Sequence, residues 1–144
     1  MHLHKWMALL FLAVASPLMA AGSDAANDIT QMMKHTWERP DAPLQVDPVT
    51  VESDYAVAGW TQGKRGGRAL LQRVEGQWRV VLCAGDALRK AETLRRAGLS
   101  AQEADSLSQA IARSESSIAP ERLKQFALFQ GTQRMDGHPH PADH

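Results

Sequence analysis

The sequence predicts an α+β domain with an N-terminal helix, a four-stranded antiparallel meander and three short C-terminal helices packed on the sheet. Between residues 44 and 82, apolar residues alternate with polar ones, the period of half-buried strands. After residue 85 the apolar spacing changes to the three and four residues of amphipathic helices. The chain has 144 residues, of which 44% are apolar and 22% charged, as expected for one globular unit. We therefore expect a single domain over residues 24–131.

The N-terminal segment 1–21 is predicted to be a secretory signal peptide. A weakly basic start precedes an apolar run at residues 7–14, and the small residues Ala20, Ala21 and Gly22 resemble a cleavage site. The apolar run is shorter than the roughly 20 residues that a membrane-spanning helix needs. We therefore expect an exported protein with no stable membrane insertion after cleavage.

The charge balance argues against nucleic-acid binding. Sixteen basic and sixteen acidic side chains cancel, so the chain has no overall field that would attract a polyanion. No catalytic constellation is visible in the predicted sheet, and the chain is not expected to be an enzyme.

A first helix is predicted over residues 24–37, and a strand over residues 44–52. The helix prediction depends on the i, i+3, i+4, i+7 spacing of Ile29, Met32, Met33 and Thr36. The strand contains Pro48, which cannot donate a ladder hydrogen bond, so the strand is expected at a sheet edge or to be bulged.

Three further strands are predicted at residues 55–61, 68–74 and 78–82. In the last of them Trp78, Val80 and Leu82 are expected to share one face. Glu75-Gly76 is predicted to form a hairpin turn. The glycine- and cation-rich loop 62–67 could cradle an anion, but it lacks the ending of a nucleotide-binding loop and is expected to be a solvated turn.

The C-terminal helices are predicted from their start signals. Asp86 is expected to cap the first helix, which should continue to Gly98. Ser100 and Glu103 form the capping-box pattern for the second helix, and Pro120 suits the first turn of the last.

Cys83 is the only cysteine and has no internal disulfide partner. A buried apolar filler, a metal ligand and an intermolecular disulfide are all open, and its place at the end of an apolar strand favours burial. Met32 and His35 lie three residues apart on the first helix and form a possible secondary copper site with Cys83. The alternative is a core methionine beside a solvent-exposed histidine.

The C-terminal segment 132–144 is predicted to be a flexible metal-binding tail. Six candidate ligands lie within ten residues: Met135, Asp136, His138, His140, Asp143 and His144. Neutral imidazoles suit copper, zinc and nickel, and the nearby thioether favours copper, as Cu(I) or Cu(II). The alternative is a solvated tail whose histidines bind metal only incidentally.

Four stretches of the chain resemble the bacterial family of copper uptake system-associated proteins. These stretches are TWERPDAPL, VAGWTQGKRGGRALL, WRVVLCAGDALR and the closing RMDGHPHP. The resemblance implies an exported protein, in the periplasm of a Gram-negative bacterium, that accompanies copper-uptake or copper-handling membrane components. It implies neither a reaction nor an agreed ligand set.

These observations predict a non-catalytic, copper-binding accessory protein with a carrier or handover role. Two alternatives stay open: a small ligand-binding or enzymatic domain of the nuclear transport factor 2-like type, and an interaction module without copper. A closed apolar pocket in the structure would favour the first alternative.

Overall fold

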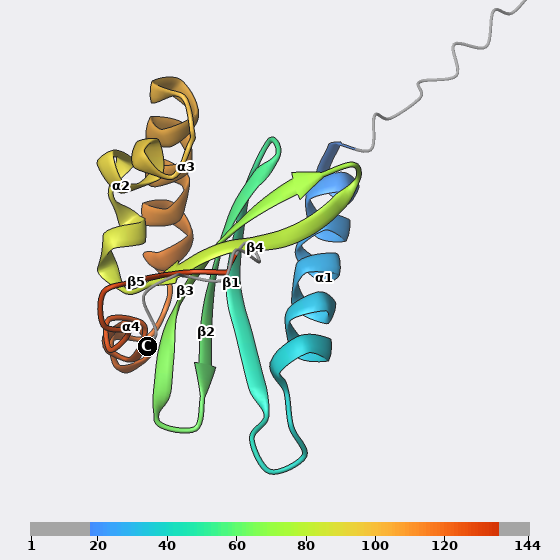
Figure 1. Ribbon diagram of the computed structural model, residues 1–144, viewed down its shortest axis with the longest axis vertical. Coiled ribbons are helices and arrows are strands. Elements are labelled where there is room, and N and C mark those ends of the chain that lie inside the picture. The colour runs from blue at the N-terminus through green and yellow to red at the C-terminus, as the bar shows by residue number, and fades with distance from the viewer. Residues whose placement is uncertain (1–17, 136–144) are drawn as a thin grey trace, which may run out of the picture.

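A computed structural model describes residues 18–135, with side chains from Asp24 onward. The elements follow in the order α1 (Leu18–Trp37), β1 (Leu44–Glu52), β2 (Tyr55–Gln62), β3 (Arg65–Val74), β4 (Gln77–Ala84), the 3-10 helix η1 (Asp86–Arg89), α2 (Ala91–Arg96), α3 (Ala101–Glu115), α4 (Pro120–Phe126) and β5 (Thr132–Arg134). The strands form one antiparallel sheet in chain order, with α1 on one face and α2 and α3 on the other (Figure 1). The predicted α+β class is confirmed.

The sheet has a fifth strand that the sequence did not predict. β5 pairs with residues 82–84 of β4, and the backbone N–H of Met135 donates to the carbonyl of Val81 at 2.8 Å. The strand is short and polar, so it carries no alternating pattern. The ordered sheet therefore extends into the segment predicted as the tail.

The helix α1 begins at Leu18, six residues before the predicted start at Asp24. The small residues 20–22, expected at a cleavage site, have helical backbone, and residues 1–17 of the predicted signal peptide lie outside the described residues. Among helices in the described part of the chain, none is both long and apolar enough to cross a bilayer.

The turn at Glu75-Gly76, the loop 62–67 and the irregularity at Pro48 were all expected from the sequence. Glu75 and Gly76 have φ of 52° and 77°, which confirms the tight hairpin turn. The predicted loop 62–67 is shorter than expected, because residues from Arg65 onward belong to β3. β1 is the edge strand and its register shifts between Val46 and Val49, as Pro48 predicted.

A β-bulge in β4 changes which face its side chains occupy. Leu70 pairs with Leu82 but Leu71 pairs with Val80, so Val81 is an extra residue on β4. An inserted residue reverses the alternation beyond it. The prediction that Leu82 shares a face with Trp78 and Val80 is therefore wrong.

The helix predicted to start at Asp86 is interrupted. Lys90 is extended, with φ −97° and ψ 127°, and separates η1 from α2. Asp86 is not a cap; its carboxylate accepts a hydrogen bond from Arg68 at 2.9 Å. The capping box of Ser100 and Glu103 and the placement of Pro120 in the first turn of α4 are confirmed.

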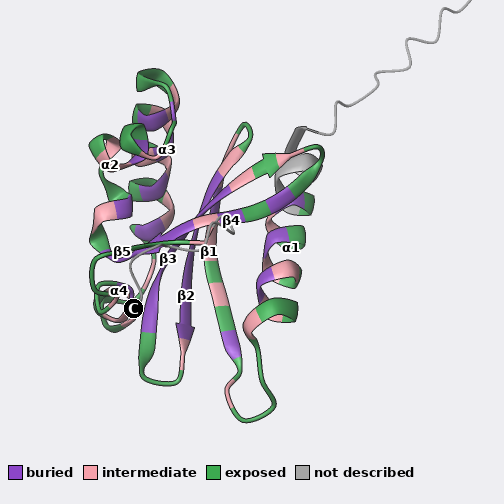
Figure 2. Ribbon diagram, viewed as in Figure 1, coloured by how far each residue is buried: buried purple, intermediate pink, exposed green. Residues whose placement is uncertain are grey.

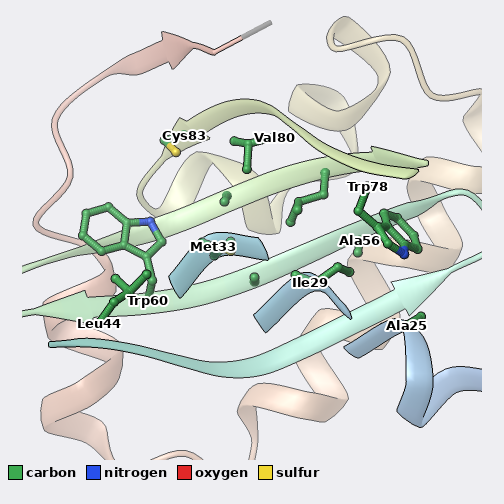
Figure 3. Packing of buried hydrophobic residues seen from close by; sticks show 12 residues of the cluster. Ala25, Ile29, Met33, Leu44, Ala56, Trp60, Trp78, Val80 and Cys83 are labelled. Carbon is green, nitrogen blue, oxygen red and sulfur yellow. The ribbon is translucent and has the colours of Figure 1, made fainter. Parts of the chain in front are cut away.

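The sheet separates two hydrophobic clusters (Figure 2). The α1-side cluster consists of Ala25, Ile29, Met33, Leu44, Ala56, Ala58, Trp60, Ala69, Leu71, Trp78, Val80 and Cys83 (Figure 3). The α3-side cluster consists of Val57, Leu70, Leu82, Ala84, Leu88, Leu94, Leu99, Ala104, Leu107 and Ile111. Of the stripe predicted for α1, Ile29 and Met33 are buried and Met32 is half-buried, but Thr36 is exposed. The helix α3 buries Ala104, Leu107 and Ile111 at amphipathic spacing.

Glycines allow α4 and the segment after it to lie close to the sheet. A Cβ on Gly59 would lie 2.5 Å from Cζ of Phe126, and one on Gly66 would overlap the backbone carbonyl of Gln125. Both residues are in strands, where a glycine often marks the close approach of another segment. Phe126, fully buried by this contact, has the guanidinium groups of Arg68 and Arg122 at 5.3 Å and 4.9 Å from its ring centroid.

Candidate metal-binding residues and their surroundings

Cys83 lies in the α1-side cluster with 9% of its surface exposed, which confirms the predicted burial. Burial raises the pKa of its thiol to about 11, because the apolar surroundings disfavour the thiolate. A thiol must lose its proton to become a strong metal ligand or nucleophile. Cys83 is therefore protonated at neutral pH and fills space in the cluster (Figure 3).

Met32 and His35 are three residues apart on α1 but differ in exposure. Met32 is half-buried and packs against the α1-side cluster, whereas His35 is exposed. The hydroxyl of Thr36 donates to the carbonyl of Met32 at 2.8 Å. The arrangement matches the alternative of a core methionine beside a solvent-exposed histidine.

Met135 is the one candidate ligand of the tail that the structure describes. It is half-buried and packs against the α1-side cluster, and β5 just before it pairs Gln133 with Cys83. The other predicted ligands lie outside the described residues: Asp136, His138, His140, Asp143 and His144. Met135 therefore lies at the sheet edge beside the α1-side cluster.

Sulfur atoms gather in and around the α1-side cluster. Met33 and Cys83 belong to it, and Met32 and Met135 pack against it. Sequence reasoning did not connect these residues, because they come from α1, β4 and the residue after β5. Within residues 18–135, no group of three or more His, Cys, Asp or Glu side chains is arranged to hold a metal ion.

A buried ionic cluster lies on the opposite face of the sheet, and sequence reasoning missed it. Arg68 and Glu115 are 1% and 4% exposed and form two hydrogen bonds, each 2.8 Å long, through Nε and Nη2. Arg89 approaches the same carboxylate at 3.3 Å, and Asp86 binds Nη1 of Arg68. Burial alone would lower the pKa of Arg68, but its carboxylate partners raise it, so the guanidinium stays charged.

This ionic cluster connects elements of the sheet and of the helical layer. In the part of the chain that the structure describes, every buried side-chain polar atom has a hydrogen-bond partner. Arg68 comes from β3, Glu115 from the end of α3 and Asp86 from η1. The cluster therefore joins the sheet to the helical layer.

A groove of about 890 Å³ crosses the edge strand β1 between α1 and α4. Lys34 and Gln31 of α1, Gln45 of β1, and Arg122 and Gln125 of α4 contribute to its lining. It is open, and polar and apolar atoms contribute about equally to its lining. This differs from the closed apolar pocket expected for a ligand-binding domain of the nuclear transport factor 2-like type.

Comparisons of the chain with models of protein families, with curated proteins and with solved structures found no match. Membership of the copper uptake system-associated family, expected from the four quoted stretches of sequence, therefore stays a prediction.

Proposed function

We propose that this chain is a periplasmic copper-binding accessory protein that carries or hands over copper without catalysing a reaction. His138 and His140 would anchor the ion with Met135, and Asp136 and His144 would complete its coordination. The resemblance to the copper uptake system-associated family supports the metal and the compartment. The donor chemistry supports copper too, because imidazole and thioether together suit this metal.

The position of Met135 is the observation that carries the proposal. Its backbone N–H is bound to Val81 and its side chain packs against the α1-side cluster, so the first donor of the tail is held by the domain. The remaining donors follow within the nine residues that end the chain. A site that starts at an anchored donor orders fewer residues on binding, which lowers its entropic cost.

A handover role follows from a tail with several donors. Its ligands can be exchanged one at a time with those of an acceptor, so the ion need not be released to water. The expected partners are copper-uptake or copper-handling membrane components, as the family resemblance implies. No nucleic acid is expected among them, given the balanced charge.

A copper titration of the mature chain tests this proposal. We expect removal of residues 136–144 to abolish most binding of Cu(II), and of Cu(I) in the presence of a competing chelator. The thermal midpoint of unfolding should change little, because this truncation keeps Met135 and its contacts. Binding to the intact chain should weaken below about pH 6, where protons compete for the imidazoles.

Three variants separate the donors. Combined His138→Ala and His140→Ala should weaken binding nearly as much as the truncation does. Met135→Leu removes the thioether but keeps a side chain of similar size, so it should weaken Cu(I) binding without unfolding the edge. Cys83→Ala should leave copper binding unchanged, because the thiol is buried and protonated. Equal affinities of intact and truncated chains would contradict the proposal and direct attention to Cys83, Met32 and His35.

A further inference from the structure

The edge strand β1 has backbone groups that are bound by side chains instead of by another strand. β1 is nine residues long and pairs only with β2 among the described strands. A long free edge offers N–H and C=O groups to a strand of another molecule, and natural sheets generally protect such edges. Two helices flank this edge, α1 and α4, and both contribute to the groove that crosses it.

The ion pair of Lys34 and Glu38, at the C-terminal end of α1, binds the backbone N–H and C=O of Leu44, the first residue of β1. Nζ of Lys34 donates to the carbonyl of Leu44 at 3.0 Å, and Oε2 of Glu38 accepts the N–H of Leu44 at 2.9 Å. Lys34 and Glu38 are themselves 2.7 Å apart. The pair thus supplies one donor and one acceptor, as a residue of a neighbouring strand would. The pKa of Glu38 is lowered by the hydrogen bonds from Lys34 and from the Leu44 N–H, so its carboxylate stays charged.

From α4, Arg122 binds the same strand three residues further along. Its Nη2 and Nε donate to the carbonyl of Asp47 at 2.8 Å and 3.1 Å, and its Nη1 donates to the hydroxyl of Thr61 at 2.6 Å. The guanidinium is held in place by the ring of Phe126 at 4.9 Å. The groove over β1 is therefore unsuited to strand addition, because these donors and acceptors are already taken.

We propose that Lys34, Glu38 and Arg122 form an edge guard that keeps β1 from pairing with β1 of a second copy of this chain. A second copy is the expected occupant because two identical edge strands can pair antiparallel about a two-fold axis, which makes the contact self-complementary. The guard covers residues 44–47, which form the first part of β1 and extend into its bulge. When the guard is removed, the exposed backbone groups of each copy satisfy those of the other.

The test compares two double variants of the mature chain that carry the same net charge. Lys34→Ala with Glu38→Ala removes the donor and the acceptor, whereas Lys34→Gln with Glu38→Gln keeps an amide donor and an amide acceptor. By analytical ultracentrifugation, the alanine variant should shift in weight-average mass toward a dimer at concentrations where the parent stays monomeric. The glutamine variant should stay monomeric.

Two controls test whether dimerisation of the alanine variant occurs through the β1 edge. Combined Glu92→Ala and Arg96→Ala removes a comparable i,i+4 ion pair, 2.5 Å long, on α2 and should leave the mass unchanged. Hydrogen exchange at the Leu44 amide should be fast in the dilute alanine variant and slow again when it is concentrated. If that variant fails to fold by circular dichroism, Glu38→Ala is compared with Glu38→Gln, which carries the same net charge and keeps an amide acceptor for the Leu44 N–H.

A folded alanine variant that stays monomeric at every concentration would overturn the proposal. A glutamine variant that associates as strongly as the alanine variant would also overturn it, since hydrogen bonding would then not be the cause.

Discussion

The two faces of the sheet are closed by different physical means. The α1-side cluster is entirely apolar and sulfur-containing, whereas the opposite face combines the α3-side cluster with the buried ion pair of Arg68 and Glu115. Burying apolar area stabilises without requiring a partner, but a buried charge needs one. On the α1 face, the loss of stability should therefore scale with the amount of side chain that a substitution removes. On the other face, removing one charge should cause a large loss of stability.

The largest expected effect comes from breaking the buried pair. Glu115→Ala should lower the free energy of unfolding by about 4 kcal/mol, because Arg68 would remain buried without its main carboxylate partner. Urea denaturation of the variant and the parent measures this difference. The exposed pair of Arg73 and Asp54, 2.9 Å long against 2.8 Å for the buried pair, provides the matched control.

Asp54→Ala should lower the free energy of unfolding by less than about 1 kcal/mol, because both members of the Arg73–Asp54 pair are exposed to solvent. Combined Arg68→Met and Glu115→Leu should recover much of the loss seen with Glu115→Ala, since replacing both charges by apolar side chains removes the desolvation cost. Equal, small effects of Glu115→Ala and Asp54→Ala would show that the two faces do not differ in this way.

On the α1 face, Trp78→Ala should lower the free energy of unfolding by about 3 kcal/mol through loss of packing. The indole keeps 9% of its surface exposed and lies under the guanidinium of Arg73 at 5.4 Å, which places it at the margin of the cluster. Trp78→Phe should retain most of the stability in the same denaturation experiment. An unchanged midpoint for Trp78→Ala would contradict the packing of β4 against α1.

The smallest expected effect concerns Cys83 and alkaline pH. Its pKa is about 11 in the folded chain against a reference of 9.0, so the protonated thiol contributes stability that is complete below pH 9. That contribution is lost as pH rises from 9 toward 11, and at pH 10 the loss should be on the order of 1 kcal/mol.

Urea denaturation of the parent and of Cys83→Ala at pH 8 and pH 10 separates the contribution of the Cys83 thiol from the contributions of other groups that titrate in this range. The parent should lose more stability between the two pH values than the variant does. The same loss in both proteins would place the thiol in contact with solvent.

Features of the fold that depend on residues close together in sequence could be predicted. Features that depend on how one strand pairs with another could not. The hairpin turn at Glu75 and the capping box at Ser100 depend on neighbours a few residues away, and both were predicted. The bulge at Val81 depends on how β4 meets β3, and it reversed the expected face of Leu82. β5 was missed because three polar residues carry no strand pattern of their own.

The same distinction between local and long-range signals applies to the candidate site residues and the ionic cluster. The burial of Cys83 was predicted from the apolar strand around it. The partnership of Arg68 with Glu115 joins residues 47 positions apart, and no local spacing predicts it. The position of Asp86 predicts a helix cap, yet the buried guanidinium of Arg68 competes more strongly for its carboxylate.

The close contact of Gly59 with Phe126 has a consequence for how this sequence can drift over generations. Any side chain at position 59 would enter the space of the aromatic ring, so that position can enlarge only if position 126 shrinks at the same time. A smaller residue at 126 would in turn leave the guanidinium groups of Arg68 and Arg122 without the aromatic ring that each of them lies over. Four positions that are distant along the chain are thus expected to vary together or not at all.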